Sequence, residues 1–207
     1  MYMKSHITDP GAAPQLPQPV QSLLETYLAE LYRWNVRLNL TTVPPELAWE
    51  RHVVEPLLNL ESGLGGDWDG MVVADLGSGC GVPGIPCALA FAPSRMVLVE
   101  KDERKAAFLT HVSGLLELGT VDVVAQPAEE MGRDADYSSR FDLIVTRAAG
   151  RLDRVIRIGM PLLRPGGSIA ALARPDAPML ELLAVAATGC GALLDHVDTG
   201  CVVVRKG

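Results

Sequence analysis

One run of fifteen residues, VVADLGSGCGVPGIP at positions 72–86, constrains the fold of this chain more than any other segment. A short apolar stretch is followed there by four glycines between positions 77 and 84. Glycines let a turn adopt backbone conformations that other residues avoid, and they let a ligand approach the main chain closely. The run therefore predicts a buried strand, a ligand-binding turn and a helix in immediate succession.

Strand-like and helix-like segments alternate from this run to the C-terminus. Strands are expected at 72–75, 96–100, 121–126, 141–146 and 168–173, helices at 86–92, 104–118 and 179–188 with another ending at 163, and a turn at 164–167. Such alternation is typical of an open, mostly parallel sheet that helices cover on both faces. The last two strand-like runs, ALLDHV and CVVVRKG, are too close for a helical crossover and should form an antiparallel hairpin. The predicted fold class is α/β, with a seven-stranded sheet.

The N-terminal region follows a different pattern. Four prolines within residues 1–20 predict a flexible tail that packs little. Apolar residues then recur every three or four positions from 20 to 40, which indicates an amphipathic helix, and a second helix is expected at 46–60. We therefore expect a tail at 1–20, a small helical extension at 21–62 and a ligand-binding domain at 63–207.

Composition narrows the class of protein. The formal net charge is −7, which argues against nonspecific binding to long duplexes, although a local basic patch could still meet one docked RNA site. No apolar run is long enough to span a membrane, and the first residues lack the apolar segment of a secretory signal. The four cysteines have neither zinc-site nor CxxC spacing, so we expect reduced thiols, no metal site and a cytoplasmic protein. Nothing in the sequence requires more than a monomer.

Two glycine patterns overlap in the turn and favour different cofactors. The spacing Gly79-x-Gly81-x-x-Gly84 matches dinucleotide sites. The spacing Asp75-x-Gly77-x-Gly79-x-Gly81 matches the acidic loop that binds S-adenosylmethionine. A carboxylate here would repel a pyrophosphate but suits a cofactor that carries an ammonium and a sulfonium. The sequence thus favours S-adenosylmethionine and leaves a nicotinamide or flavin dinucleotide, or a turn that binds nothing, as alternatives.

Further candidate cofactor residues follow the next two strands. Glu100 ends the strand at 96–100, where its carboxylate could accept hydrogen bonds from ribose hydroxyls; a solvated charge is the alternative. Ala128 and Glu129 follow the third strand, where a loop would cover an adenine. All three residues are therefore candidates to contact the nucleoside part of a cofactor.

Four segments, taken in order, resemble a known family. They are LYRWNVRLNLTTV at 31–43, RHVVEPL at 51–57, ADLGSGCGVPGIP at 74–86 and FDLIVTRAAGRL at 141–152. The chain resembles the RsmG proteins, formerly called glucose-inhibited division protein B, which methylate guanine N7 in bacterial small-subunit ribosomal RNA. The resemblance implies a Rossmann-like class I methyltransferase fold with an N-terminal helical extension. It also implies a cytoplasmic enzyme that acts on 16S ribosomal RNA of the small ribosomal subunit.

The same resemblance implies roles for particular residues. Gly77 and Val82 should line the methionine side of S-adenosyl-L-methionine, and Ala128 and Glu129 should contact its adenine. Arg147 should stand near both the cofactor and the target base. The implied product is S-adenosyl-L-homocysteine.

Basic side chains are the candidates for RNA contact. Arg147, Arg151, Arg154 and Arg157 recur at intervals of four, three and three, which would form a basic stripe along a helix. An ion pair of Arg147 with a nearby aspartate is the alternative. The full set of residues expected to bind RNA is Asn39, Arg51, His52, Arg104, Arg147 and Arg151.

The implied chemistry demands little of acid–base groups. Guanine N7 carries a free lone pair and needs no deprotonation before it attacks a sulfonium methyl. The chain has neither an Asp-Pro-Pro-Tyr motif for an exocyclic amine nor a paired catalytic cysteine. We therefore expect no general base and leave the catalytic residues unassigned, with alignment of N7, methyl and sulfur as the main contribution.

The chain departs from the family pattern at a few positions. Glu55-Pro56 stands where the family commonly has Asp-Ser, two acids precede Arg104, and Ala173 replaces a family lysine next to Arg174. These departures leave open a cofactor-binding, RNA-associated protein without turnover, beside the dinucleotide-dependent oxidoreductase.

Overall fold

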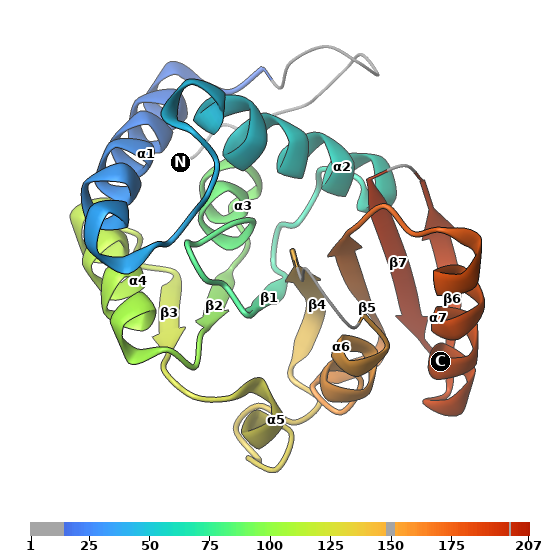
Figure 1. Cartoon of the computed structure of the whole chain (residues 1–207). Helices are drawn as coiled ribbons and strands as arrows, with labels where there is room; N and C mark the ends of the chain where they lie inside the picture. The colour runs from blue at the N-terminus through green and yellow to red at the C-terminus, as the bar shows by residue number, and fades with distance from the viewer. Residues whose placement is uncertain (1–14, 148–151, 199) are drawn as a thin grey trace.

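The computed structural model describes residues 15–147, 152–198 and 200–207, and Figure 1 shows one sheet flanked by helices. The seven strands lie in the order β3-β2-β1-β4-β5-β7-β6. They are β1 Val72–Leu76, β2 Arg95–Val99, β3 Val121–Val124, β4 Phe141–Thr146, β5 Leu163–Leu172, β6 Ala192–Val197 and β7 Cys201–Lys206. β1 to β5 pair in parallel, and β7 pairs antiparallel with β5 and with β6. The predicted α/β class, mostly parallel sheet and C-terminal hairpin are confirmed.

Helices surround the sheet and also form the N-terminal region. They are α1 Gln18–Leu38, the 3-10 turn η1 Pro45–Leu47, the π-helix η2 Glu50–Val54, α2 Glu55–Leu64, α3 Gly84–Phe91, α4 Glu103–Leu115, α5 Ala128–Met131, α6 Leu152–Gly159 and α7 Ala177–Gly189. In Figure 1, α1, α2, α3 and α4 lie together, whereas α6 and α7 lie apart from them. The expected second helix at 46–60 is three short segments of different pitch.

Two hydrophobic clusters fill the space on opposite faces of the sheet. Side chains alternate between the two faces along a strand. On β2, Met96 and Leu98 join the cluster under α3 and α4, and Val97 and Val99 join the cluster under α6 and α7. The near-continuous apolar run at 96–99 is therefore explained by burial on both faces.

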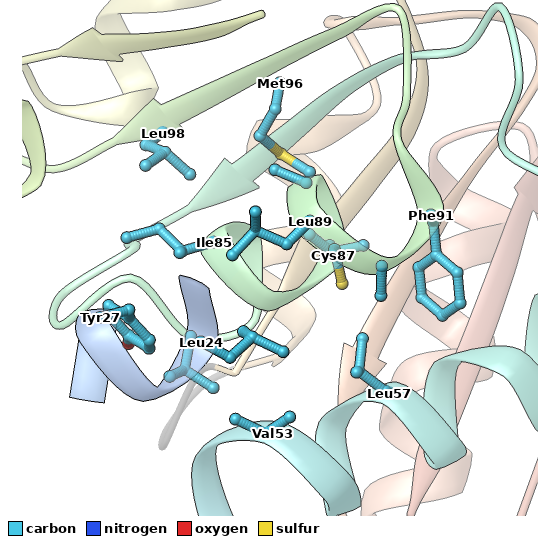
Figure 2. Close-up of a cluster of buried hydrophobic side chains, with 14 of the residues drawn as sticks. Leu24, Tyr27, Val53, Leu57, Ile85, Cys87, Leu89, Phe91, Met96 and Leu98 are labelled. Atoms are coloured by element: carbon cyan, nitrogen blue, oxygen red, sulfur yellow. The ribbon is translucent and has the colours of Figure 1, made fainter. Parts of the chain in front are cut away.

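Helix α3 lies between the sheet and the N-terminal helices, and all of its residues are buried. Figure 2 shows Ile85 and Leu89 of α3 among Leu24 of α1, Leu57 of α2 and Met96 of β2. One cluster thus joins the predicted extension to the sheet. The division into an extension at 21–62 and a domain at 63–207 stays a prediction, but the two parts share their core.

The N-terminal end of the structure differs from the predicted tail at 1–20. Helix α1 already begins at Gln18, and Leu16 and Val20 are buried. Proline is tolerated in the first turn of a helix, where its missing N–H has no partner to lose, so these prolines start the helix. The rest of the predicted tail, residues 1–14, lies outside the described residues.

Two further differences lie near the carboxyl half of the sheet. The expected turn at 164–167 is part of β5, where the pairing with β4 shifts register between Phe141 and Leu143. The residues after β3 form the short helix α5 rather than a loop. A glycine-rich bulge and a single helical turn both lack the apolar periodicity from which a sequence predicts elements.

Candidate functional site

The glycine turn after β1 has an open side and a packed side. Gly77 and Gly79 have φ angles of +75° and +56°, which glycine adopts without strain. A Cβ atom built on Gly77 would meet nothing within 4 Å, whereas one on Gly81 would come within 2.6 Å of Ile85. The backbone at Gly77 and Gly79 is therefore free to receive a ligand, and Gly81 is needed for packing beneath it.

Neighbouring elements hold this turn in place. The N–H groups of Gly77 and Ser78 both donate to the carbonyl of Val99, at 2.9 and 3.0 Å. The hydroxyl of Tyr27, a fully buried residue of α1, donates to the carbonyl of Cys80 at 2.8 Å. The turn is thus fixed from β2 on one side and from the N-terminal helix on the other.

Glu100, predicted to bind a ribose, lies directly after β2 and is buried against the turn. One carboxylate oxygen accepts from the N–H of Gly79 and the other from the N–H of Asp102, both at 2.9 Å. Each carboxylate oxygen has a second lone pair, so a ligand hydroxyl could still bond to it. The structure therefore gives Glu100 a role in shaping the turn that the sequence did not predict.

Asp75 lies at the base of the turn and is completely buried. Its Oδ2 accepts from the N–H of Gly84 at 3.1 Å, whereas Oδ1 has no partner among the described residues. Burial raises the pKa of the Asp75 carboxyl to about 7. A buried, unsatisfied carboxylate oxygen is costly unless a donor or a positive charge approaches it. This orphaned atom below an open glycine turn fits a cationic cofactor better than a pyrophosphate.

Arg147, at the end of β4, joins the glycine turn to the N-terminal helices. Its Nη1 donates to the carbonyl of Arg51 at 3.1 Å and to Nδ1 of His52 at 3.3 Å, and its Nη2 lies 3.9 Å from the sulfur of Cys80. The aspartate pairing that the sequence left open is absent for Asp142, which accepts from Val72 and pairs with Arg164. Arg147 is therefore the residue at which the predicted cofactor and RNA sites meet.

His52, predicted to bind RNA, is fully buried behind Arg147. Its Nε2 lies 3.0 Å from Oγ1 of Thr41. Because a guanidinium can only donate, Nδ1 of His52 must accept from Arg147, and the proton of the neutral ring must sit on Nε2 and point to Thr41. Burial, and next the charge of Arg147, lower the pKa of His52 to about 4. His52 is thus a neutral support for Arg147 in the structure.

Hydrogen bonds between the last turn of α1 and the segment after it hold Thr41, the partner of His52. The side chain of Asn35 donates to the carbonyl of Thr41 and accepts from its N–H, both at 2.9 Å. Asn39 ends α1 in the left-handed conformation, with φ of 49°. Asn35, Thr41 and Tyr27 are not among the site residues that the sequence predicts. The first two lie in the segment at 31–43, which is part of the family resemblance.

A pocket of about 290 Å³ is lined in part by Arg147. Its polar lining comprises Arg51, Glu55, Asn59, Arg147 and Arg174, with Ala173 beside them. Two of the departures from the family pattern, at Glu55 and at Ala173, therefore fall in one place. Three guanidinium groups make the pocket suitable for an anionic or base-like ligand.

The remaining predicted site residues lie elsewhere. Arg104 is exposed beside Asp102, and Asn39 is exposed at the end of α1. Val82 is buried within the turn, and Ala128 and Glu129 begin α5, where Glu129 pairs with Arg154. Arg151 lies outside the described residues.

The described residues contain neither a cluster of metal-binding side chains nor a membrane-spanning helix. No group of three or more histidine, cysteine, aspartate or glutamate side chains is placed to hold a metal ion in that part of the chain. No helix among those residues is long and apolar enough to cross a membrane.

The strand order and the glycine turn define a Rossmann-like class I methyltransferase fold. M. jannaschii TYW2, solved in complex with AdoMet, is similar with a TM-score of 0.53 and 18% identity over 71% of this chain and 74% of that chain. A branched-chain polyamine synthase from Thermus thermophilus gives a TM-score of 0.62 and 15% identity over 86% of this chain and 62% of that chain. At such low identity these likenesses show the fold alone.

The chain belongs to the rRNA small subunit methyltransferase G (GidB) family, whose model matches residues 20–182. Proteins named Ribosomal RNA small subunit methyltransferase G are similar: that of Sorangium cellulosum is 39% identical over 74% of this chain and 64% of its own length. That of Roseiflexus castenholzii is 38% identical over 70% of this chain and 61% of its own length. The matched part thus spans less than two thirds of these relatives. The predicted RsmG resemblance is confirmed.

Proposed function

We propose that this chain transfers the methyl group of S-adenosylmethionine to N7 of a guanine in 16S ribosomal RNA of the small ribosomal subunit. The observation that carries the proposal is Arg147, which touches the glycine turn at Cys80 and also lines the basic pocket. A cofactor site and a nucleotide site are thus adjacent on one side chain. Membership of the methyltransferase G family supports this and argues against the oxidoreductase alternative.

The residues of the turn suit S-adenosylmethionine, which would supply an electrophilic methyl on sulfur. The open backbone at Gly77 and Gly79 would admit its methionine part, and Asp75 would balance its positive charge. Glu100 would accept from its ribose. Val82 would lie along the methionine side, with Ala128 and Glu129 beside its adenine, so the cofactor would run from the turn toward α5.

The chain's own contribution to the reaction would be alignment. Guanine N7 attacks without losing a proton, so no general base is required. The guanidinium of Arg147, fixed by the Arg51 carbonyl and by His52, would orient the O6 edge of the base or a phosphate. Orientation of this kind can lower a barrier by about 7–11 kcal/mol at its upper limit.

The substrate would reach the site from the ribosomal subunit. We propose that the protein acts in the cytoplasm as a monomer, and that Arg51 and the exposed Arg104, Arg154 and Asn39 meet RNA phosphates or sugars. Arg151 belongs to the same proposal through the sequence alone. The target base would come from a non-duplex region, where it can be unstacked at low cost.

The deciding experiment uses labelled S-adenosylmethionine and small subunits from a strain that lacks this activity. Borohydride and aniline cleavage maps N7-methylguanosine, and one labelled guanine is the expected result. Arg147→Ala should abolish labelling, whereas Arg95→Ala, at the start of β2 and far along that strand from the glycine turn, should leave it unchanged. Cofactor binding without label on subunits, naked RNA or precursor particles would instead support the alternative without turnover.

A further inference from the structure

Attack by N7 does not by itself select guanine. Adenine also presents N7 as an acceptor, so an enzyme that only aligns N7 would accept both purines. The two bases differ at C6, where guanine has an acceptor that Arg147 could contact and adenine has a donor. They differ further on the opposite edge, where guanine has N1–H and a 2-amino group as donors and adenine has an acceptor at N1. A carboxylate accepts both guanine hydrogen bonds and repels the lone pair of adenine.

The pocket beside Arg147 contains one such group. Among the described residues that line it, Glu55 is the only acid, and the other charged residues are Arg51, Arg147 and Arg174. The Glu55 side chain is 32% exposed, so it is reachable from the pocket but partly shielded from water. Hydrogen bonds in such a setting discriminate more strongly than those in open solvent.

The Glu55 carboxylate is already paired with a donor group that resembles the donor edge of guanine. Nη1 of Arg51 lies 2.5 Å from Oε1 of Glu55. A guanidinium presents N–H groups to a carboxylate much as the N1–H and 2-amino groups of guanine would. The Arg51 side chain is 47% exposed and could leave for an RNA phosphate when a base arrives.

The backbone explains why these side chains meet at the pocket. Arg51 lies in the π-helix η2, a wide turn that is frequent at functional sites, and Glu55 is the first residue of α2. Within η2 the consecutive residues Arg51 and His52 are exposed and fully buried, respectively. The same turn thus supplies the support of Arg147 and, on its outer side, the pair with Glu55.

We propose that Glu55 selects guanine by accepting hydrogen bonds from N1–H and the 2-amino group of the target base. Until RNA binds, the guanidinium of Arg51 occupies the position that the base would take at the Glu55 carboxylate. The inference rests on the proposed guanine-N7 activity and names the residue that would make it specific. Glu55 occupies a position where this chain departs from the family's Asp-Ser, but the side chain there is still a carboxylic acid.

The test compares two small-subunit substrates, one with guanosine and one with inosine at the mapped target. Inosine keeps N7, O6 and N1–H but lacks the 2-amino group. Wild-type protein should lose about tenfold or more in kcat/KM on inosine, because a charge-assisted hydrogen bond is lost. Glu55→Ala should slow guanosine methylation at least about tenfold and bring the guanosine-to-inosine ratio close to one. The ratio is internal to each variant and does not depend on how much of it is folded.

Two variants and one control complete the experiment. Glu55→Gln keeps the side-chain volume and should lower the ratio, since an amide is uncharged and sets one acceptor oxygen and one donor group against the two guanine donors. Glu50→Gln removes an exposed acid of η2 that does not line the pocket, and should keep the wild-type ratio. A preserved ratio in Glu55→Ala, or a wild-type ratio near one, would overturn the role of Glu55. Wild-type protein that labels no guanine N7 would overturn the proposed function instead.

Arg51 gives a separate prediction of the same proposal. Arg51→Ala should leave the guanosine-to-inosine ratio unchanged and raise KM, because it removes a phosphate contact but leaves Glu55, which recognises the base, in place. A KM that does not change, or a ratio that falls with the loss of Arg51, would contradict its role as a placeholder for the base.

Discussion

His52 contacts two parts of the site through opposite ring nitrogens, and only the neutral ring can do so. Its folded-state pKa is about 4, below the ordinary 6.5. Above pH 6.5 both folded and unfolded forms are neutral and stability is complete. As the pH falls from about 6.5 to about 4, the unfolded chain gains a proton first, and up to about 3 kcal/mol of stability is lost.

Denaturant titrations of wild-type protein and His52→Gln between pH 7.5 and 4.5 would measure this loss. The free energy of unfolding should fall faster with acidity in the wild type, so that the gap between the two proteins narrows. A gap that stays constant over this range would show that burial of His52 is not linked to its protonation.

Asp75 should make cofactor binding depend on pH as well, but here the charged form of the side chain is the one that the ligand favours. Its buried carboxyl is half protonated near pH 7, and a bound cation would favour the ionised form. The affinity for S-adenosylmethionine should therefore rise by up to about tenfold from pH 6 to pH 8, with release of a proton. Calorimetry in two buffers of different ionisation enthalpy would detect that proton, and Asp75→Asn should bind with no such dependence.

Tyr27 carries the contact between α1 and the glycine turn. Tyr27→Phe leaves the Cys80 carbonyl without its partner in a buried place, which should cost about 1–3 kcal/mol of stability and weaken cofactor binding. Tyr32→Phe is the matched control, because its hydroxyl donates to the carbonyl of Val43 at 2.8 Å and not to a residue of the turn. Equal affinities of both variants for S-adenosylmethionine would mean that α1 does not support the turn.

At the scale of elements, the sequence predicts the regular strands and helices but not the irregular segments that occur once in the fold. Each strand was expected within a few residues of its place, because a buried parallel strand is a continuous apolar run. The π-helix η2, the bulge in β5 and the single turn α5 have no periodic signal. The hydrogen bond from Arg147 to the carbonyl of Arg51 was not predicted either, since it joins residues 96 positions apart that only tertiary packing brings together.

The glycine turn shows the same limit at closer range. Its cofactor class was predicted from spacing, and the open side at Gly77 agrees with it. What spacing did not reveal is that Glu100 bonds to the turn itself, because that contact depends on how β2 ends beside β1.

For the whole molecule, the shared core predicts one cooperative unfolding transition. The cluster around α3 joins α1 and α2 to β1 and β2, so the N-terminal helices have no separate core to keep them folded. Native-state hydrogen exchange should give amides in the middle of α1 and of β1 similar opening free energies. A clearly lower value for α1 would show that the extension at 21–62 unfolds as a unit of its own.

The complete burial of α3 also limits how the proposed site could admit RNA. Swinging the N-terminal helices aside as a lid would expose the apolar face of α3 that they cover, at a cost that scales with the area uncovered. We therefore expect the proposed site to open by movement of surface side chains, above all Arg51, while the packed helices stay in place. Access to such a site would depend on the shape of the RNA and little on backbone motion of the protein.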